Sequence, residues 1–95
     1  MKAVIDGQVI AESSDMVEVG GYQYFPQSDV RMEWLKKTPR TASDHECPHS
    51  VQFYDVVIDG KRHERAAWNY EAPLPRMKQV TGRFGFWEDV KVIYG

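Results

Sequence analysis

The sequence lacks the features that define several common classes of protein. It has one cysteine, so no disulfide can form within the chain, and a reducing compartment such as the cytoplasm is expected. No apolar run approaches the ~20 residues of a membrane-spanning helix, and Met1–Gly7 has no long apolar stretch like that of a signal peptide. The net charge of -2 predicts no basic face for nucleic acid. We therefore expect a cytoplasmic protein that binds neither membranes nor nucleic acid.

Aromatic residues are plentiful for so short a chain, with five tyrosines, four phenylalanines and three tryptophans. A length of 95 residues predicts a single domain that spans residues 1–95. Because a small domain buries a smaller share of its surface than a large one, each large side chain matters for its stability. The composition therefore favours a small core rich in aromatic rings.

The turn signals predict a mainly β fold. Asp6-Gly7 and Asp59-Gly60 each lie between alternating apolar and polar runs, which is the strongest short-range signal for a β-hairpin. Gly20-Gly21 marks a further turn, and Glu88-Asp89 is expected to join the arms of a last hairpin. Gly82 and Gly85 interrupt the first arm of that hairpin, where we expect a bulge or a close backbone approach. We predict a bent antiparallel sheet or a partly open barrel.

Val51–Ile58 is the clearest strand, and both of its faces are largely apolar. This pattern is typical of a central strand that is covered on two sides. Asp55 is the one charge on an otherwise apolar face of the run. We expect it either to lie near an edge in water or to pair with Arg65 or Arg83 in a structural ion pair.

Residues 28–37 carry the pattern of one short α-helix. Ser28 is a suitable N-cap, and two lysines at the far end suit the negative end of the helix dipole. Val30, Trp34 and Leu35 form one narrow apolar face, and Pro39 would end the helix. The polar segment from Thr38 to Pro48 is expected to be a long connection.

Short motifs recur along the chain in a distinctive order. They are Tyr24-Phe25-Pro26, Asp29-Val30, Cys47-Pro48, Ala66-Ala67-Trp68-Asn69-Tyr70 with Pro73, and Val80-Thr81-Gly82 leading to Phe86. In this order they resemble the bacterial domain-of-unknown-function family 427 (DUF427), and the likeness spans essentially the whole chain. The resemblance implies a small, mostly antiparallel β domain similar to the β-tent architecture of methionine sulfoxide reductase B and of the ligand domain of cereblon. It implies no settled activity.

The chain departs from the pattern of that family at two places. Relatives usually place a Lys-Gly pair shortly after Cys-Pro, where this chain has His49-Ser50-Val51. Relatives also tend to carry an aspartate just before Ala-Ala-Trp, where this chain has Arg65. No pocket charge is therefore carried over from the family at these positions.

The stretch from Ala66 to Pro75 is the best candidate for a ligand-facing surface. Trp68 and Tyr70 would project to one face of a strand, and two prolines stiffen the loop that follows. Aromatic walls with a few polar groups are typical of small-ligand pockets, but also of the cores of small β domains. Our leading hypothesis is a small-molecule binding domain. Its predicted cleft is lined by Tyr24, Cys47, Trp68, Tyr70 and Glu71.

Cys47 supports an alternative from another class, an enzyme that uses its thiol or a metal beside it. His45 and His49 flank it, and a neighbouring imidazolium lowers the pKa of a thiol. In an extended segment these three side chains would point the same way, as zinc ligands do, but a structural zinc site needs a fourth ligand. We predict no metal site and no cofactor. A third hypothesis is a homomeric interaction module, a homodimer that pairs through an exposed edge strand.

Overall fold

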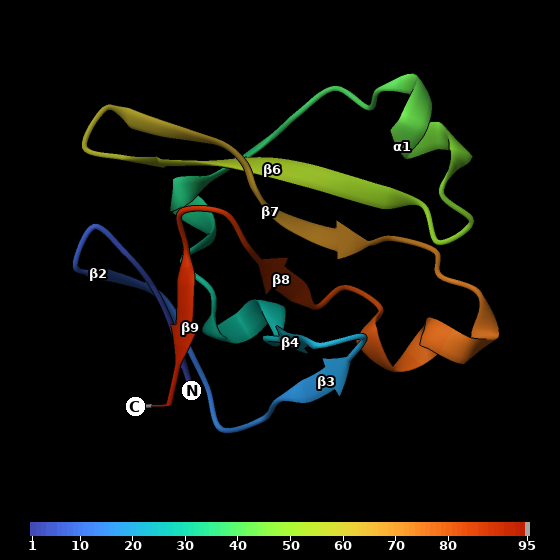
Figure 1. Ribbon diagram of the computed structural model, residues 1–95, viewed down its shortest axis with the longest axis horizontal. Coiled ribbons are helices and arrows are strands. Elements are labelled where there is room, and N and C mark those ends of the chain that lie inside the picture. The colour runs from blue at the N-terminus through green and yellow to red at the C-terminus, as the bar shows by residue number, and fades with distance from the viewer. Residues whose placement is uncertain (95) are drawn as a thin grey trace.

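The computed structural model describes residues 1–94, and the chain in it is mainly β, with three antiparallel sheets (Figure 1). The strands are β1 Lys2–Ile5, β2 Gln8–Glu12, β3 Val17–Val19, β4 Tyr22–Tyr24, β5 Leu35–Lys37, β6 Val51–Ile58, β7 Lys61–Tyr70, β8 Phe84–Phe86 and β9 Lys91–Ile93. The predicted antiparallel β class is confirmed. The single domain over residues 1–95 stays a prediction, and its last residue, Gly95, lies outside the described residues.

The two Asp-Gly turns form where the sequence predicts them. Asp6-Gly7 joins β1 to β2 and Asp59-Gly60 joins β6 to β7, and both residues of each turn have positive φ. Gly20-Gly21 likewise joins β3 to β4. The prediction of a hairpin across Glu88-Asp89 is wrong, because the strands on its two sides do not pair with each other: β8 pairs with β7 and β9 pairs with β1. The turn therefore carries the chain from one sheet to another.

The α-helix predicted at residues 28–37 is also wrong. The segment forms two 3-10 turns, Gln27–Asp29 and Met32–Trp34, and then enters β5. Tertiary pairing overrides the helical pattern, because Val30 makes a β-bridge with Ala11 and Leu35 pairs with Val56. Val30 and Leu35 are both buried in these positions.

The α-helix within residues 1–94, α1 Ala42–Glu46, instead lies in the segment predicted to be a loop. A capping box starts it, in which Thr41 and Asp44 exchange hydrogen bonds between side chain and backbone. A further 3-10 helix, Pro75–Val80, follows β7. Within residues 1–94, no helix is long and apolar enough to cross a membrane.

The sheet in the order β5-β6-β7-β8 carries a separate apolar cluster on each face. One face packs against β1 and β2, which lie with β9 at one side of the molecule (Figure 1). The other face carries Trp68. The β3–β4 hairpin lies beside this sheet at β8, because Phe25 and Phe84 exchange backbone hydrogen bonds of 2.9 Å. The side chains of this second face form the candidate site.

A bulge in β7 explains the lone charge of β6. Opposite Asp55, β7 has the three residues Glu64–Ala66, and Arg65 adopts a positive φ of 51°. The Asp55 carboxylate accepts the backbone N–H of Arg65 at 2.9 Å and pairs with the side chain of Arg62. The expected structural pairing is therefore present, but through Arg62 and the backbone of Arg65. Arg83 pairs elsewhere, with Asp15.

Candidate functional site

Trp68 lies at the centre of a group of rings on one face of β6, β7 and β8. It is 4% exposed, and its ring meets those of Tyr22 and Trp87 edge-on, with centroids 4.9 and 5.2 Å away. Tyr24 also meets it edge-on, and Phe53 pairs with it across the strands. Edge-to-face contacts of this kind stabilise aromatic groups beyond the area that they bury. The aromatic cluster is defined here as Tyr22, Tyr24, Phe53, Trp68, Tyr70 and Trp87.

Gly85 makes room for the Trp68 indole. The two residues are cross-strand partners, and a Cβ added at Gly85 would lie 2.6 Å from Cζ2 of Trp68. No real Cβ makes so short a contact, so the indole rests directly on bare backbone. The close approach to the backbone predicted for Gly82 and Gly85 is therefore confirmed at Gly85 but not at Gly82, where an added Cβ would meet nothing within 4 Å.

The polar atoms of the cluster are not all satisfied. The buried Nε1 of Trp68 has no hydrogen-bond acceptor among residues 1–94, whereas Nε1 of Trp87 donates to the carbonyl of Arg65 at 2.6 Å. Burial raises the pKa of the Tyr24 phenol far above its usual range, and the Tyr70 hydroxyl beside it raises it further. The Trp68 N–H, which lies near the Tyr24 hydroxyl, lowers that pKa, but the two groups do not meet the geometry of a hydrogen bond. Tyr24 is therefore a neutral hydroxyl beside an unpaired donor.

Cys47 and His49 lie at the rim of the aromatic cluster. Cys47 is half-buried and packs against it, and the His49 ring meets Tyr70 edge-on at 5.4 Å. Nδ1 of His49 accepts the backbone N–H of Leu74, which leaves that nitrogen unavailable to a metal. His45 is exposed on α1, so the extended segment that would align the two histidines with Cys47 does not exist. Residues 1–94 contain no group of three side chains arranged to hold a metal ion.

Glu71 lies apart from the other predicted site residues. Side chains alternate along β7, so Tyr70, its last residue, shares the face of Trp68. Glu71 follows the strand and lies on the opposite face, with Arg40, which also donates to Gln52. There its carboxylate pairs with Arg40 and, at 3.3 Å, with Lys37. The structure thus brings together Tyr24, Cys47, Trp68 and Tyr70 and separates Glu71 from them.

Arg65 and Asp44 tie α1 to the aromatic cluster, a contact that the sequence reasoning missed. The Arg65 guanidinium donates to both oxygens of Asp44, at 2.8 and 3.1 Å, and lies 3.9 Å from the centre of the Phe53 ring. The hydrogen bonds from Arg65, aided by the Thr41 backbone, hold the pKa of Asp44 down to about 2, against the effect of burial. The capping-box spacing from Thr41 to Asp44 was the signal that could have located α1.

The lowered pKa of Asp44 predicts a loss of stability in acid. The pKa of Asp44 in the folded protein, about 2, lies below the usual value of 3.8 for an aspartate. Its contribution to the free energy of unfolding is therefore present above about pH 4 and is lost as the pH falls toward 2. Urea unfolding gives the free energy of unfolding of the natural protein and of Asp44→Asn. The difference between these two values is expected to be constant from about pH 5 to 7 and to shrink below about pH 4. A difference that stays the same down to about pH 2 would contradict this assignment.

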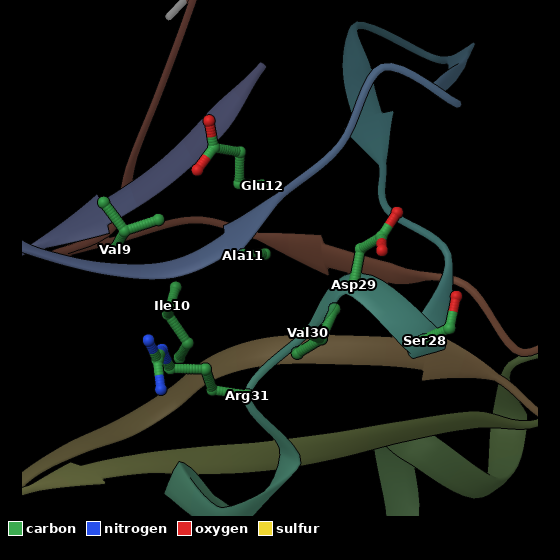
Figure 2. A pocket seen from close by; sticks show the side chains of 8 residues that line it. All are labelled: Val9, Ile10, Ala11, Glu12, Ser28, Asp29, Val30 and Arg31. Atoms are coloured by element: carbon green, nitrogen blue, oxygen red, sulfur yellow. The ribbon is translucent and has the colours of Figure 1, made fainter.

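A groove lies away from the aromatic cluster, between Val9–Glu12 and Ser28–Arg31 (Figure 2). Its volume is about 340 Å³, and no residue of the cluster lines it. Sequence reasoning missed it because it assigned residues 28–37 to a helix, whereas Val30 in fact lies beside β2. The groove and the aromatic cluster are two separate candidate surfaces.

Comparison with known proteins identifies a family but no close characterised relative. A family model described as "Domain of unknown function (DUF427)" matches residues 1–94. No curated protein matches the chain. The resemblance that the order of the motifs indicated is therefore confirmed over the whole described range.

Proposed function

The chain belongs to the DUF427 family, an uncharacterised small domain, and we propose that it binds a small molecule on the aromatic cluster. The family supplies no ligand, so the proposal stands on the cluster itself. Cys47, a single free cysteine, supports the cytoplasm as the place where the protein acts.

The unpaired indole N–H of Trp68 is the observation that carries the proposal. Leaving a buried donor without an acceptor costs about 1–3 kcal/mol, and such groups are rare in native proteins. A ligand that offers an acceptor to this N–H would remove the penalty on binding. The neighbouring hydroxyls of Tyr24 and Tyr70 add two groups that both donate and accept.

The exposure of the surrounding rings also supports a binding surface. Phe53, Tyr70 and Trp87 are only half-buried, and Tyr22 is 40% exposed, although all four surround a buried tryptophan. Such rings offer flat apolar contact at a low entropy cost, because each has only two side-chain torsions to fix. The ligand that fits has a compact apolar body and at least one hydrogen-bond acceptor. Glu71 faces the other side of the sheet and is left out of the proposed surface.

A screen of small heteroaromatic compounds, followed by backbone amide chemical shifts, tests this proposal. Hits are expected to move the amides of Trp68–Tyr70, Cys47 and His49. Trp68→Phe, which keeps a ring but removes the N–H, is expected to weaken a hit by about tenfold, the effect of one lost hydrogen bond. Trp34→Phe, which changes a tryptophan outside the cluster, is the matched control. Hits that move only the Asp59-Gly60 turn or the chain ends would place the site elsewhere.

A further inference from the structure

The indole N–H of Trp68 is closed off from solvent in this structure. Its Nε1 atom is buried, and Trp68 as a whole is 4% exposed. A ligand acceptor needs to come within about 3 Å of that nitrogen to form a hydrogen bond. The atoms that cover the nitrogen must therefore move before a ligand can bind there.

The neighbours of Nε1 show which segment covers it. The nitrogen lies near the Tyr24 hydroxyl, which in turn lies beside the hydroxyl of Tyr70, the last residue of β7. Figure 1 shows the next segment of the chain, in orange, where it leaves the end of β7. Met77 and Val80 of this segment pack in the same apolar cluster as Tyr24 and Trp68. The segment therefore covers the Tyr24 side of the indole.

Residues 72–79 of this segment, called the strap here, form a loop with joined ends. Tyr70 and Thr81, which flank the loop, make a parallel β-bridge. The side chains of the strap are exposed, except that Pro73 and Met77 are half-buried. A compact loop with close ends is an Ω-loop, a type that is often functional. Because the strap buries so little surface, it is a segment that can open at a low free energy while the rest stays folded.

A single latch holds the middle of the strap. Nδ1 of His49 accepts the backbone N–H of Leu74 at 3.0 Å. Among residues 1–94, this is the only hydrogen bond that joins the strap to a part of the chain distant in sequence. The β3–β4 hairpin, which also packs on the cluster, is fastened by two backbone bonds between Phe25 and Phe84. The strap is therefore the cover that opens more easily.

We propose that the strap is a lid over the Trp68 N–H and that the bond from Leu74 to His49 is the latch that keeps the lid closed. Opening lifts Met77 from the aromatic cluster and lets a ligand reach the indole nitrogen. The lid rests on the proposed binding of a small molecule at Trp68, for which it supplies the entrance. His49 is a positioning residue, because it sets how often the site is open and need not touch the ligand.

Hydrogen exchange of the Trp68 indole proton in the free protein measures the opening, because a buried proton exchanges only when water reaches it. His49→Phe keeps a ring beside Tyr70 and removes the acceptor. It is expected to speed the exchange about three- to tenfold, the effect of one lost hydrogen bond. His49→Asn keeps an acceptor oxygen where Nδ1 lies, and its exchange rate is expected to stay within about twofold of the natural rate.

His45→Phe is the matched control, because it makes the same change at an exposed histidine of α1. It is expected to leave the exchange rate unchanged. Equal rates in His49→Phe and His49→Asn would overturn the latch. Exchange of the indole proton only through complete unfolding, at the rate of the backbone amides in the middle of β7, would overturn the lid.

The exchange measurement uses no ligand, so it decides the lid whether or not the screen of compounds gives a hit. For a hit, association with His49→Phe is expected to be faster by the same three- to tenfold factor, roughly, because the open state is more populated. Binding that persists with an unchanged association rate would overturn the strap as the entrance and leave the binding site at Trp68 standing.

Discussion

Replacing Trp68 by alanine is expected to lower the free energy of unfolding by about 3–5 kcal/mol, the usual effect of deleting a buried aromatic ring. The indole is 4% exposed and contacts rings from two other strands, β4 and β6, and the ring of Trp87, so its removal leaves a hole that they cannot all fill. The total free energy of unfolding of a domain is only about 5–15 kcal/mol, so this loss is a large fraction of its stability. Urea unfolding measures it.

Tyr94→Ala is the control for this prediction, because Tyr94 is an aromatic residue that is 87% exposed. Its removal is expected to change the free energy of unfolding by less than about 0.5 kcal/mol, as for most surface substitutions. Equal shifts of the urea midpoint in Trp68→Ala and Tyr94→Ala would show that the aromatic cluster does not determine the stability of the fold.

Replacing Gly85 by alanine is expected to destabilise the protein by about 1–3 kcal/mol, the range for overpacking a core. The added Cβ would lie 2.6 Å from the Trp68 ring, so the indole or β8 must move. The sign is informative, because the same change inside an unstrained strand stabilises a protein by roughly 0.5–1 kcal/mol. Urea unfolding of the variant measures both sign and size.

A double-mutant cycle with Trp68→Phe isolates the cause of the Gly85 effect. The smaller ring leaves space for the new methyl group, so Gly85→Ala is expected to cost less in that background than in the natural sequence. Strictly additive effects would show that the loss comes from the backbone of β8 and not from the indole.

Local turn chemistry explains why much of the fold could be predicted from the sequence. Asp6-Gly7 and Asp59-Gly60 adopt positive φ at both residues, and few other residue pairs do so cheaply. These turns fix the pairing of β1 with β2 and of β6 with β7. The two apolar faces of β6 also indicated that it is a central strand, and it lies between β5 and β7.

Long-range pairing explains what the sequence could not predict. Val30 and Leu35 have helical spacing, but each pairs with a distant strand, at Ala11 and Val56. Those partners lie about 20 residues away, and no local pattern marks them. The turn at Glu88-Asp89 fails for the same reason, because β9 finds its partner in β1 at the other end of the chain.

The candidate site was predictable where strand alternation governs it. Trp68 and Tyr70 share a face because they are two residues apart on β7, and Tyr24 joins them from β4. Glu71 could not be placed from the sequence, since its side depends on where β7 ends and on the positions of Arg40 and Lys37. The contact of Arg65 with Asp44 likewise depends on the bulge that gives Arg65 its positive φ.

The chemical shift of the Trp68 indole N–H proton tests the central claim most directly, because that proton is the unpaired donor on which ligand binding is proposed. In the free protein it is expected to resonate upfield of the Trp87 indole proton, which is hydrogen-bonded to Arg65. On saturation with a ligand that binds the aromatic cluster, it is expected to move downfield, while the Trp34 indole proton stays in place. A Trp68 indole resonance that is unchanged when every hit from the screen is at saturation would contradict the account.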